Sequence, residues 1–325
     1  MMKPRPGVDP RFLSYHYLSF DQSKSLRFLY AGLRNTIRSS DFKNIHFSVP
    51  PYLEQQQIAD YLDHETAEID MFLSDLEALS RLNSERQQAY LDRTLARFKK
   101  VSDQLIPLKY CVRPNPTPRG HGRALPEKVT YLPMSAIGTF GPVDATLKRP
   151  VNEMLSGYSF VTDGDIAVAK VTPCFENGKG AVFSGLPDGV AFATTEVAVF
   201  RPTANLTADY LATVFRSSIF VLGGESAMTG AGGLRRVPDS YFLNYTVPVL
   251  STDAQKQITS EVMRMDTISN ELRHSVTQAI NLARERRAAL ITAAVTGQID
   301  VTARNKPAAE QLEDDIAQGL HREYA

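Results

Sequence analysis

Several features that would place the chain in a familiar class are missing from its 325 residues. Only two cysteines occur, Cys111 and Cys174, which excludes a disulfide scaffold or a cysteine-rich zinc site and suits a reducing compartment. No apolar run approaches the ~20 residues of a membrane span. The positive charges of the first ten residues are followed by no apolar stretch of the kind found in a secretory signal. We therefore expect a cytoplasmic protein.

The motifs of common catalytic sites are missing as well. The glycine-rich stretch 229–236 lacks the Gly-Lys-Ser/Thr ending of a phosphate-binding loop, and His64-Glu65 lacks the second histidine of a zinc-protease helix. No Gly-x-Ser-x-Gly elbow occurs. The sequence "VPPY" (49–52) begins with valine, which cannot bond an adenine amino group as the Asn or Asp of a methyltransferase motif does. We predict a non-enzyme with no catalytic residue, metal or cofactor.

The whole chain has no excess of positive or negative charge, because its 36 Lys and Arg balance its 36 Asp and Glu. The distribution is uneven, however. Residues 1–52 hold eight basic and three acidic side chains, whereas residues 53–100 hold six basic and ten acidic ones. Basic patches on a neutral chain are compatible with nucleic-acid binding and do not require it.

What the chain does contain is an internal repeat with an offset close to 200 residues. The stretch "GLRNTIRSSDFKN" (32–44) resembles "GLRRVPDSYFLN" (233–244), and "LNSERQQAYLDRTL" (82–95) resembles "LARERRAALITAAV" (282–295). Each copy is predicted to contain a short helix, a Gly-Leu-Arg loop, a turn, a strand ending in Val-Pro and a long helix. Long repeats determine the architecture of a chain, so this one organises the interpretation.

The two long helices are predicted at 53–98 and 252–296, about 45 residues each, or ~65–70 Å at 1.5 Å per residue. Apolar residues recur at steps of three and four in both, and in the second they form a coiled-coil seam interrupted by Ser269 and Arg286. We expect the helices to pack against each other in antiparallel fashion. A helical hairpin for oligomerisation and a spacer between two recognition modules both remain open.

Residues 106–250 are predicted to be rich in strands, so the fold class is α+β, with a β-rich domain, short helices and two long antiparallel helices. Strands are predicted within 128–137, 165–173, 179–185 and 195–202, and a short helix near 207–220. The pair Asn177-Gly178 is a strong hairpin signal, because glycine tolerates the positive φ that tight turns need.

Candidate recognition residues are polar side chains that fall on the loops of this domain, where contacts to bases and phosphates are usually made. Asn177 could bind adenine and Glu176 could accept from cytosine. A simple turn role for Asn177 and a solvated loop for Arg235 and Arg236 remain alternatives. The full candidate set is Arg119, Arg123, Lys170, Thr172, Glu176, Asn177, Lys179, Thr195, Arg235 and Arg236.

Three stretches resemble one known family, the DNA-specificity subunits of type I restriction–modification systems. They are "VPPYLEQQQIADYLDHETAEID" (49–70), "KVTPCFENGKGAVF…GVAFATTEVAVFRP" (170–202) and "ERRAALITAAVTGQIDV" (285–301). The resemblance implies target recognition domains that each read half of a bipartite double-stranded DNA sequence in the major groove. It implies spacer helices that bind methyltransferase subunits, a restriction subunit in the same complex, and no catalysis by the subunit itself.

Two departures from the family pattern lead to expectations. The stretch "STDAQKQI" (251–258) lacks the Glu-Gln of the first helix start, so we expect a weaker start of the second helix. The chain is also expected to lack most of a first recognition domain. The predicted division is 1–52 as a remnant of that domain, 53–105 as first spacer helix and linker, 106–250 as a complete recognition domain, 251–301 as second spacer helix and 302–325 as a polar tail.

Such a chain is expected to act as a half-subunit, most simply as a symmetric homodimer joined through its long helices, or to be an inactive truncated form. Two further alternatives stay open on the sequence. One is a coiled-coil adaptor whose β-rich module has no DNA role. The other is a nuclease or methyltransferase acting alone, against which the missing metal and cofactor motifs argue.

Overall fold

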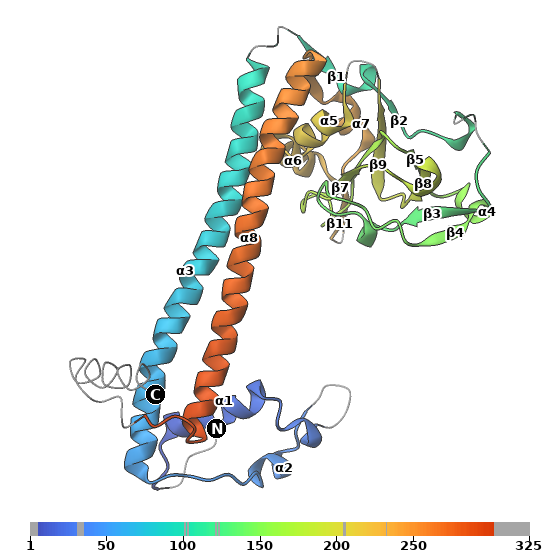
Figure 1. Ribbon diagram of the computed structural model, residues 1–325. Helices are drawn as coiled ribbons and strands as arrows, with labels where there is room; N and C mark the ends of the chain where they lie inside the picture. Colours follow the sequence, from blue (N-terminus) through green and yellow to red (C-terminus); the bar gives the residue numbers. More distant parts are fainter. Residues whose placement is uncertain are drawn as a thin grey trace, which may run out of the picture. The chain divides into compact units, whose positions relative to one another are not determined.

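The computed structural model separates into two compact units, which are described one at a time (Figure 1). Unit 1 comprises residues 1–82 and 272–325, and unit 2 comprises residues 83–271. Both long helices contribute to both units: α3 is Tyr52–Lys99 and α8 is Thr252–Val295. The described residues are 6–30, 36–100, 102, 104–120, 122, 124–203, 206–231 and 233–301.

The predicted mixture of helices and small sheets is confirmed, including the two long helices. Pro50 and Pro51 precede α3, and proline is incompatible with a helix interior because it lacks a backbone donor. Gly297, two residues after the end of α8, has φ +73°, a conformation that glycine adopts without steric cost. No helix in the described part of the chain combines the length and the hydropathy that crossing a membrane requires.

Unit 1 is helical and is built on the paired ends of α3 and α8. Its other elements are α1 (Pro10–Gln22), η1 (Arg27–Leu29) and α2 (Ser39–Lys43). Asp9 caps α1, since its Oδ1 accepts hydrogen bonds from the backbone N–H groups of Arg11 and Phe12 at 2.8 and 3.2 Å. The buried side chains of the unit 1 core come from four segments: Phe12, Ile58, Leu62, Ile291, Ala294, Val295 and Val301.

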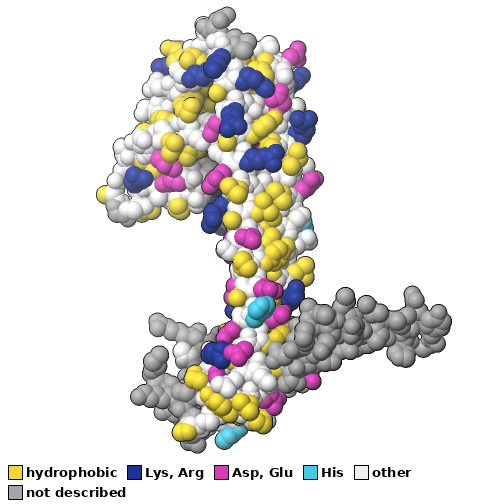
Figure 2. Space-filling view, turned by 90° about the vertical axis from the view of Figure 1, so that its left-hand side faces the viewer, with side chains coloured by type: hydrophobic (Ala, Val, Ile, Leu, Met, Phe, Trp, Pro, Cys, Tyr) yellow, Lys and Arg dark blue, Asp and Glu magenta, His cyan; other side chains and the backbone are white. Residues whose placement is uncertain are grey.

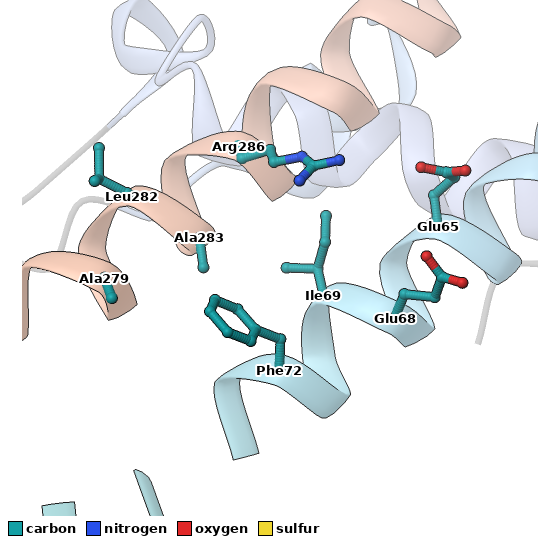
Figure 3. A pocket seen from close by; sticks show the side chains of 8 residues that line it. All are labelled: Glu65, Glu68, Ile69, Phe72, Ala279, Leu282, Ala283 and Arg286. Carbon is teal, nitrogen blue, oxygen red and sulfur yellow. The ribbon is translucent and has the colours of Figure 1, made fainter. Parts of the chain in front are cut away.

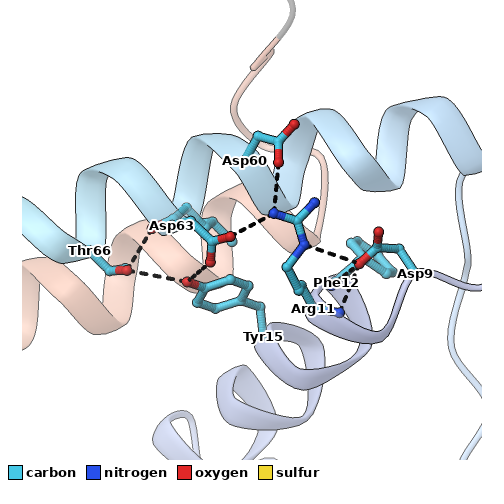
Figure 4. A network of polar contacts seen from close by, with 8 residues as sticks. Asp9, Arg11, Phe12, Tyr15, Asp60, Asp63 and Thr66 are labelled. Atoms are coloured by element: carbon cyan, nitrogen blue, oxygen red, sulfur yellow. Dashed lines mark hydrogen bonds and ion pairs between the residues drawn. The ribbon is translucent and has the colours of Figure 1, made fainter. Parts of the chain in front are cut away.

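A polar network on the surface of unit 1 fastens α1 to α3 (Figure 4). Arg11 donates to Asp63 at 2.8 Å and pairs with Asp60 at 2.7 Å. The hydroxyl of Tyr15 donates to Asp63 at 2.7 Å and lies 3.3 Å from the hydroxyl of Thr66. Because these bonds are partly exposed, they orient α1 while Phe12 supplies most of the burial.

Unit 2 contains two four-stranded sheets with the strand orders β2-β9-β6-β7 and β4-β3-β8-β5. The first sheet is antiparallel throughout, and the second contains one parallel pair, β3 with β8. All residues of β6 and β8 are buried, which explains their unbroken apolar sequences. The strands are β2 (Val112–Pro114), β3 (Lys128–Leu132), β4 (Lys148–Pro150), β5 (Ser159–Thr162), β6 (Ile166–Ala169), β7 (Gly180–Val182), β8 (Val190–Ala193) and β9 (Val197–Pro202).

Two cores hold these sheets in place. One involves both sheets, with buried side chains such as Val161 and Val199. The other lies between the first sheet and the helices and is dominated by aromatic rings, among them Phe200, Phe215 and Phe220. Such rings bury large areas and orient their neighbours by edge contacts. Short elements complete the domain: η2 (Leu108–Tyr110), η3 (Pro118–Gly120), η4 (Met134–Ala136), α4 (Val151–Met154) and η5 (Pro187–Gly189).

The single helix predicted near 207–220 is wrong, because two helices occupy this stretch. They are α5 (Ala208–Phe215) and α6 (Ser218–Ala227). Ser217 separates them, since its hydroxyl accepts a hydrogen bond from the N–H of Phe220 at 3.3 Å and so caps α6. A serine inside an apolar stretch was the available signal for this break.

The two copies of the repeat share a buried hydrogen-bond arrangement. Gln55 accepts from the N–H of Asp9 at 2.8 Å and donates to the carbonyl of Pro50 at 2.8 Å. Gln255 accepts from the N–H of Thr207 at 2.9 Å and donates to the carbonyl of Leu250 at 3.0 Å. Asp9 and Thr207 cap α1 and α5, so each glutamine joins the start of a long helix to the start of a short one.

The expected weakening of the second helix start stays a prediction, because the structure shows which bonds form there and not how stable that start is. Only the glutamate of the first copy is replaced, by Ala254, and the glutamine is retained as Gln255. The hydroxyl of Ser251 also accepts from the N–H of Ala254 at 3.3 Å. The sequence comparison missed this because two inserted residues before Gln255 shift the motif away from its Val-Pro pair.

The strand before the long helix forms in only one copy. In unit 2, β12 (Thr246–Pro248) pairs with β1 (Leu105–Pro107), and α7 (Asp239–Asn244) precedes it. In unit 1, the strand predicted to end in Val49-Pro50 is wrong: residues 45–50 have no strand structure, and no described residue pairs with them as a strand. Part of the preceding Gly-Leu-Arg loop, residues 32–34, lies outside the described residues.

Candidate nucleic-acid interface

Three segments of unit 2 come together at one edge of the β-rich domain. They are the connection 170–179 between β6 and β7, the turn 194–196 before β9, and the hairpin of β10 (Thr229–Ala231) and β11 (Leu234–Arg236). The N–H of Lys170 donates to the carbonyl of Glu196 at 2.9 Å, and the N–H of Thr172 donates to that of Arg235 at 3.0 Å. We call these three segments the loop cluster.

The loop cluster contains eight of the ten candidate residues: Lys170, Thr172, Glu176, Asn177, Lys179, Thr195, Arg235 and Arg236. Arg119 lies in η3 and is exposed, and no described contact joins it to the loop cluster. Arg123 lies outside the described residues. Segments as much as 66 residues apart (170 to 236) thus meet, which a single sequence does not reveal.

The connection 170–179 presents Asn177 to solvent. Strands β6 and β7 pair as predicted for a hairpin, but ten residues join them rather than a two-residue turn. The buried ring of Phe175 anchors the connection, and Gly178, with φ +66°, donates to the carbonyl of Phe175 at 2.8 Å. The side-chain amide of Asn177 is exposed and forms no hydrogen bond with any described residue.

The cations of the loop cluster have partners that hold them in place. Arg236 donates to both carboxylate oxygens of Glu196, at 2.9 and 2.8 Å. Lys170 pairs with Asp239 at 3.8 Å, and the ammonium of Lys179 donates to the carbonyl of Met134 at 2.9 Å. A guanidinium has five N–H donors, so Arg236 keeps donors available after this pairing.

Arg235 is held less tightly. It lies 3.9 Å from Glu176, and its side chain is about half exposed. The second oxygen of Glu176 is shielded from solvent and has no hydrogen-bond partner among the described residues. Glu176 and Asn177 also line a groove of about 390 Å³, whose other walls are Gln88, Thr139, Gly178, Arg216, Ser218, Val221 and Leu222. The carboxylate of Glu176 and the side-chain amide of Asn177 therefore lie next to each other at this groove.

A carboxylate elsewhere in the domain has a structural role. Asp165 is fully buried and accepts two hydrogen bonds from Arg201, at 2.7 and 2.8 Å. The hydrogen bond to Asp165 raises the pKa of Arg201 above its ordinary value, which keeps the guanidinium charged. Within the described residues, no three His, Cys, Asp or Glu side chains come together as metal ligands.

Sequence reasoning missed two residues at this edge. Leu234 lies in β11 and is largely exposed to solvent, although leucine is normally expected in a hydrophobic core. Arg216 pairs with Asp266 through two bonds of 2.7 and 2.8 Å and fixes α5 to α8 inside unit 2. The sequence feature that could have pointed to Arg216 is its position directly after an apolar helix.

A second surface feature is a groove in unit 1 between α3 and α8, of about 430 Å³ (Figure 3). Ile69 and Phe72 of α3 point toward Ala283 of α8, and Arg286 extends toward the side of Glu65. Among the residues that line this groove, Phe72 and Leu282 are at least half exposed. Figure 2 shows apolar side chains among the charged ones along the helices.

Comparison with known proteins finds partial matches to one family. A model of the type I restriction modification DNA specificity domain matches residues 3–75. The specificity subunit of the type I restriction enzyme EcoEI of Escherichia coli is 38% identical over 149 residues, and that of EcoAI of the same organism is 36% identical over 149 residues. Part of this chain is therefore similar in sequence to the type I DNA-specificity subunits. Each alignment covers 45% of this chain but 25% of the curated specificity subunit.

One solved structure has a similar fold. A chain from a structural study of type I restriction–modification complex assembly and conformational transition has a TM-score of 0.59, with 13% sequence identity. The match covers 91% of this chain and 73% of that one. At this identity the similarity concerns the fold alone. This chain spans about a quarter of the length of the curated specificity subunits it matches.

Proposed function

We propose that this chain is a non-catalytic subunit that reads DNA sequence for a type I restriction–modification complex. Its β-rich domain reads one half of a bipartite target through the loop cluster. The observation that supports this is the meeting of eight candidate donors and acceptors on one edge of unit 2. Side chains on loops held by a firm scaffold are well placed to reach base edges and phosphates.

Each class of side chain in the loop cluster has a matching partner on DNA. The exposed amide of Asn177 suits adenine, which presents both a donor and an acceptor in the major groove. The carboxylate of Glu176 suits the amino group of cytosine. Arg235 suits guanine or phosphate. The pairing of Arg236 with Glu196 holds its guanidinium in place before DNA arrives, which reduces the entropy lost on binding.

The unit 1 groove is proposed as the seat of a helix from the methyltransferase subunit, within a complex that also contains the restriction subunit. Its apolar floor, from Ile69, Phe72 and Ala283, suits the apolar face of a helix. The acidic rim at Glu65 and Glu68 favours basic residues beside that face. A second copy of this chain, which would form the homodimer, is the competing occupant.

Selection of bound fragments from a random pool of duplex DNA tests the reading role. The full chain should enrich a defined sequence, whereas a coiled-coil adaptor without a DNA role would enrich none. Arg235→Ala should weaken binding and lower its salt dependence if the residue contacts phosphate. Asn177→Ala should relax the preference at one base pair. Arg149→Ala, an exposed cation on β4 outside the loop cluster, is the matched control and should leave the enriched sequence unchanged.

Light scattering tests the partner role. The chain alone and the chain mixed with a type I methyltransferase subunit should differ in mass, and Phe72→Glu should abolish the mixed complex by placing a charge on the groove floor. A dimer of the chain alone that Phe72→Glu converts to a monomer would assign the groove to a second copy instead.

A further inference from the structure

The hairpin of β10 and β11 carries an apolar side chain at its tip. Three residue pairs form it, Thr229 with Arg236, Gly230 with Arg235 and Ala231 with Leu234. All six residues are exposed (β11 in Figure 1). The side chain of Leu234 is 79% exposed, more than any other large apolar residue described in unit 2. Its cross-strand neighbour is a small alanine, so Leu234 alone gives the tip an apolar projection.

The close approach of the two strands and the contacts at the base of the hairpin fix the position of Leu234. Gly230 has φ +128°, and a Cβ there would lie 2.4 Å from the carbonyl oxygen of Leu234. Only glycine therefore allows the strands to approach this closely. The base is anchored by Thr172, whose N–H and hydroxyl both donate to the carbonyl of Arg235, at 3.0 and 3.2 Å. A bridge between Val171 and Arg236 adds a second anchor.

The neighbours of Leu234 indicate what covers it. A protein-binding surface would need a contiguous apolar patch, but the rest of the described hairpin consists of glycine, threonine, alanine and arginine. Arg235 and Arg236 follow directly and bring two positive charges to the same tip. An isolated apolar group flanked by cations suits a duplex, where stacked base pairs offer an apolar interior and phosphates lie on both sides.

We propose that Leu234 is a wedge that enters between two adjacent base pairs of the bound DNA and kinks the duplex. Leucine is one of the side chains that proteins insert into base steps in this way, and such steps bend by tens of degrees. Arg235 and Arg236 hold the phosphates beside the opened step. The inference rests on the proposed DNA-reading function and adds to it a readout of deformability, because pyrimidine–purine steps open most easily.

The test uses the full chain and duplexes enriched by it from a random pool. 2-Aminopurine is placed in turn at each position, and its fluorescence rises where a base is unstacked. Energy transfer between dyes at the two duplex ends reports the bend. The wild-type chain should raise fluorescence at one step and shorten the end-to-end distance. Leu234→Ala should lose both signals and bind ~50-fold more weakly, since about three buried carbons are removed.

Two variants keep the result interpretable. Leu234→Met retains an apolar wedge and should keep the unstacking and the bend. Ile219→Ala, which truncates another well-exposed apolar residue on α6, should leave both unchanged. If Leu234→Ala unstacks and bends DNA as the wild type does, the wedge is overturned while the reading function stands. If the wild-type chain enriches no sequence at all, the reading function itself fails.

Discussion

The two units contain copies of one series of elements and use them differently. In both, a short capped helix packs on a long helix, and a buried glutamine, Gln55 or Gln255, joins their starts. In unit 2 the β-rich domain contacts the helices, with Gln88 donating to the carbonyl of Arg216 and Asp92 accepting from the N–H of Ser218. In unit 1 the helices carry an open groove. The shared part is therefore the helix start, and the difference lies in what covers the helices.

Charge also distinguishes the two parts of α3. Residues 52–82, in unit 1, contain eight Asp and Glu and one Arg, whereas residues 83–99, in unit 2, contain two acidic and four basic side chains. Lys and Arg accordingly gather on the unit 2 part of the face shown in Figure 2. An acidic surface repels phosphates, so this difference agrees with the proposals that DNA binds the β-rich domain of unit 2 and that a protein partner binds the groove of unit 1.

The largest effects are expected when the shared glutamines are replaced. Gln255→Leu leaves the N–H of Thr207 and the carbonyl of Leu250 without their partner, and both are partly or fully shielded from water. Gln55→Leu does the same at Asp9 and Pro50. We expect each to lower the free energy of unfolding of its own unit by ~2–4 kcal/mol. Hydrogen exchange, read separately for amides of each unit, measures the change.

Gln57→Leu is the control for this comparison, because Gln57 is exposed on the same helix turn and should change stability by less than ~0.5 kcal/mol. Suppose that Gln55→Leu and Gln255→Leu each lowered the protection of amides from hydrogen exchange equally in both units. The starts of α3 and α8 would then not be independent, and the two units would not unfold separately.

The next effect compares one ion pair from each unit. Asp266 forms two bonds with Arg216, and their side chains are 20% and 25% exposed. Asp70 pairs with Arg287 in unit 1, but its side chain is 53% exposed. Asp266→Ala should cost ~2 kcal/mol, because a half-buried guanidinium loses its partner. Asp70→Ala should cost less than ~1 kcal/mol.

A double-mutant cycle gives the coupling energy of each pair. Denaturant unfolding is measured for the variant without the aspartate, the variant without the arginine and the variant without both. Equal coupling in the two units would show that the β-rich domain adds no burial to the Arg216 pair, which would contradict the difference between the units.

Local patterns in the sequence predicted the two long helices and several of the strands of this fold. Prolines before α3 and helical spacing predicted the long helices, and apolar runs marked β6 and β9. The unpaired segment 45–50 has the composition of a strand, yet strand formation depends on a partner that lies elsewhere. A single sequence carries little information about such pairings.

The loop cluster was predictable in kind but not in geometry. Turn residues such as Asn177-Gly178 and the basic pair Arg235-Arg236 pointed to segments that meet in the structure. The meeting of these segments depends on sheet order, with β9 between β2 and β6, which no local pattern encodes. The exposure of Leu234 was hidden for the same reason, since hydrophobicity alone predicts burial.

A pH effect should distinguish the units. His16 is buried in unit 1 among the rings of Phe12, Phe20 and Phe47, and its Nδ1 has no hydrogen-bond partner among the described residues. Burial lowers the pKa of His16 below its ordinary value. The folded state thus favours the neutral imidazole, and this contribution is present above pH ~6.5 and is lost as the pH falls through the lowered pKa.

Val214 occupies the equivalent position in α5, since both residues lie seven positions after the cap of their helix (9 to 16 and 207 to 214). We expect amides of unit 1 to lose protection between pH 7 and 5 more than amides of unit 2, and His16→Val to remove most of the difference. Hydrogen exchange, corrected for its intrinsic pH dependence, measures this. Unchanged acid sensitivity in His16→Val would place the titrating group elsewhere.

The smallest effect concerns the helix seam. Ser269 of α8 is fully buried in unit 2, and its hydroxyl has no described hydrogen-bond partner, whereas Ile69 occupies the corresponding position of α3 in unit 1. Ser269→Ala removes a desolvated hydroxyl and improves helix propensity, so unit 2 should gain ~0.5–1 kcal/mol. Asn83 donates to the backbone carbonyl of Ser269 at 2.9 Å, and that bond survives the change. Asn83→Ala is the contrasting variant and should lower stability by ~1 kcal/mol. Denaturation midpoints give both values. A loss of stability in Ser269→Ala would mean that the Ser269 hydroxyl has a hydrogen-bond partner, for example a buried water.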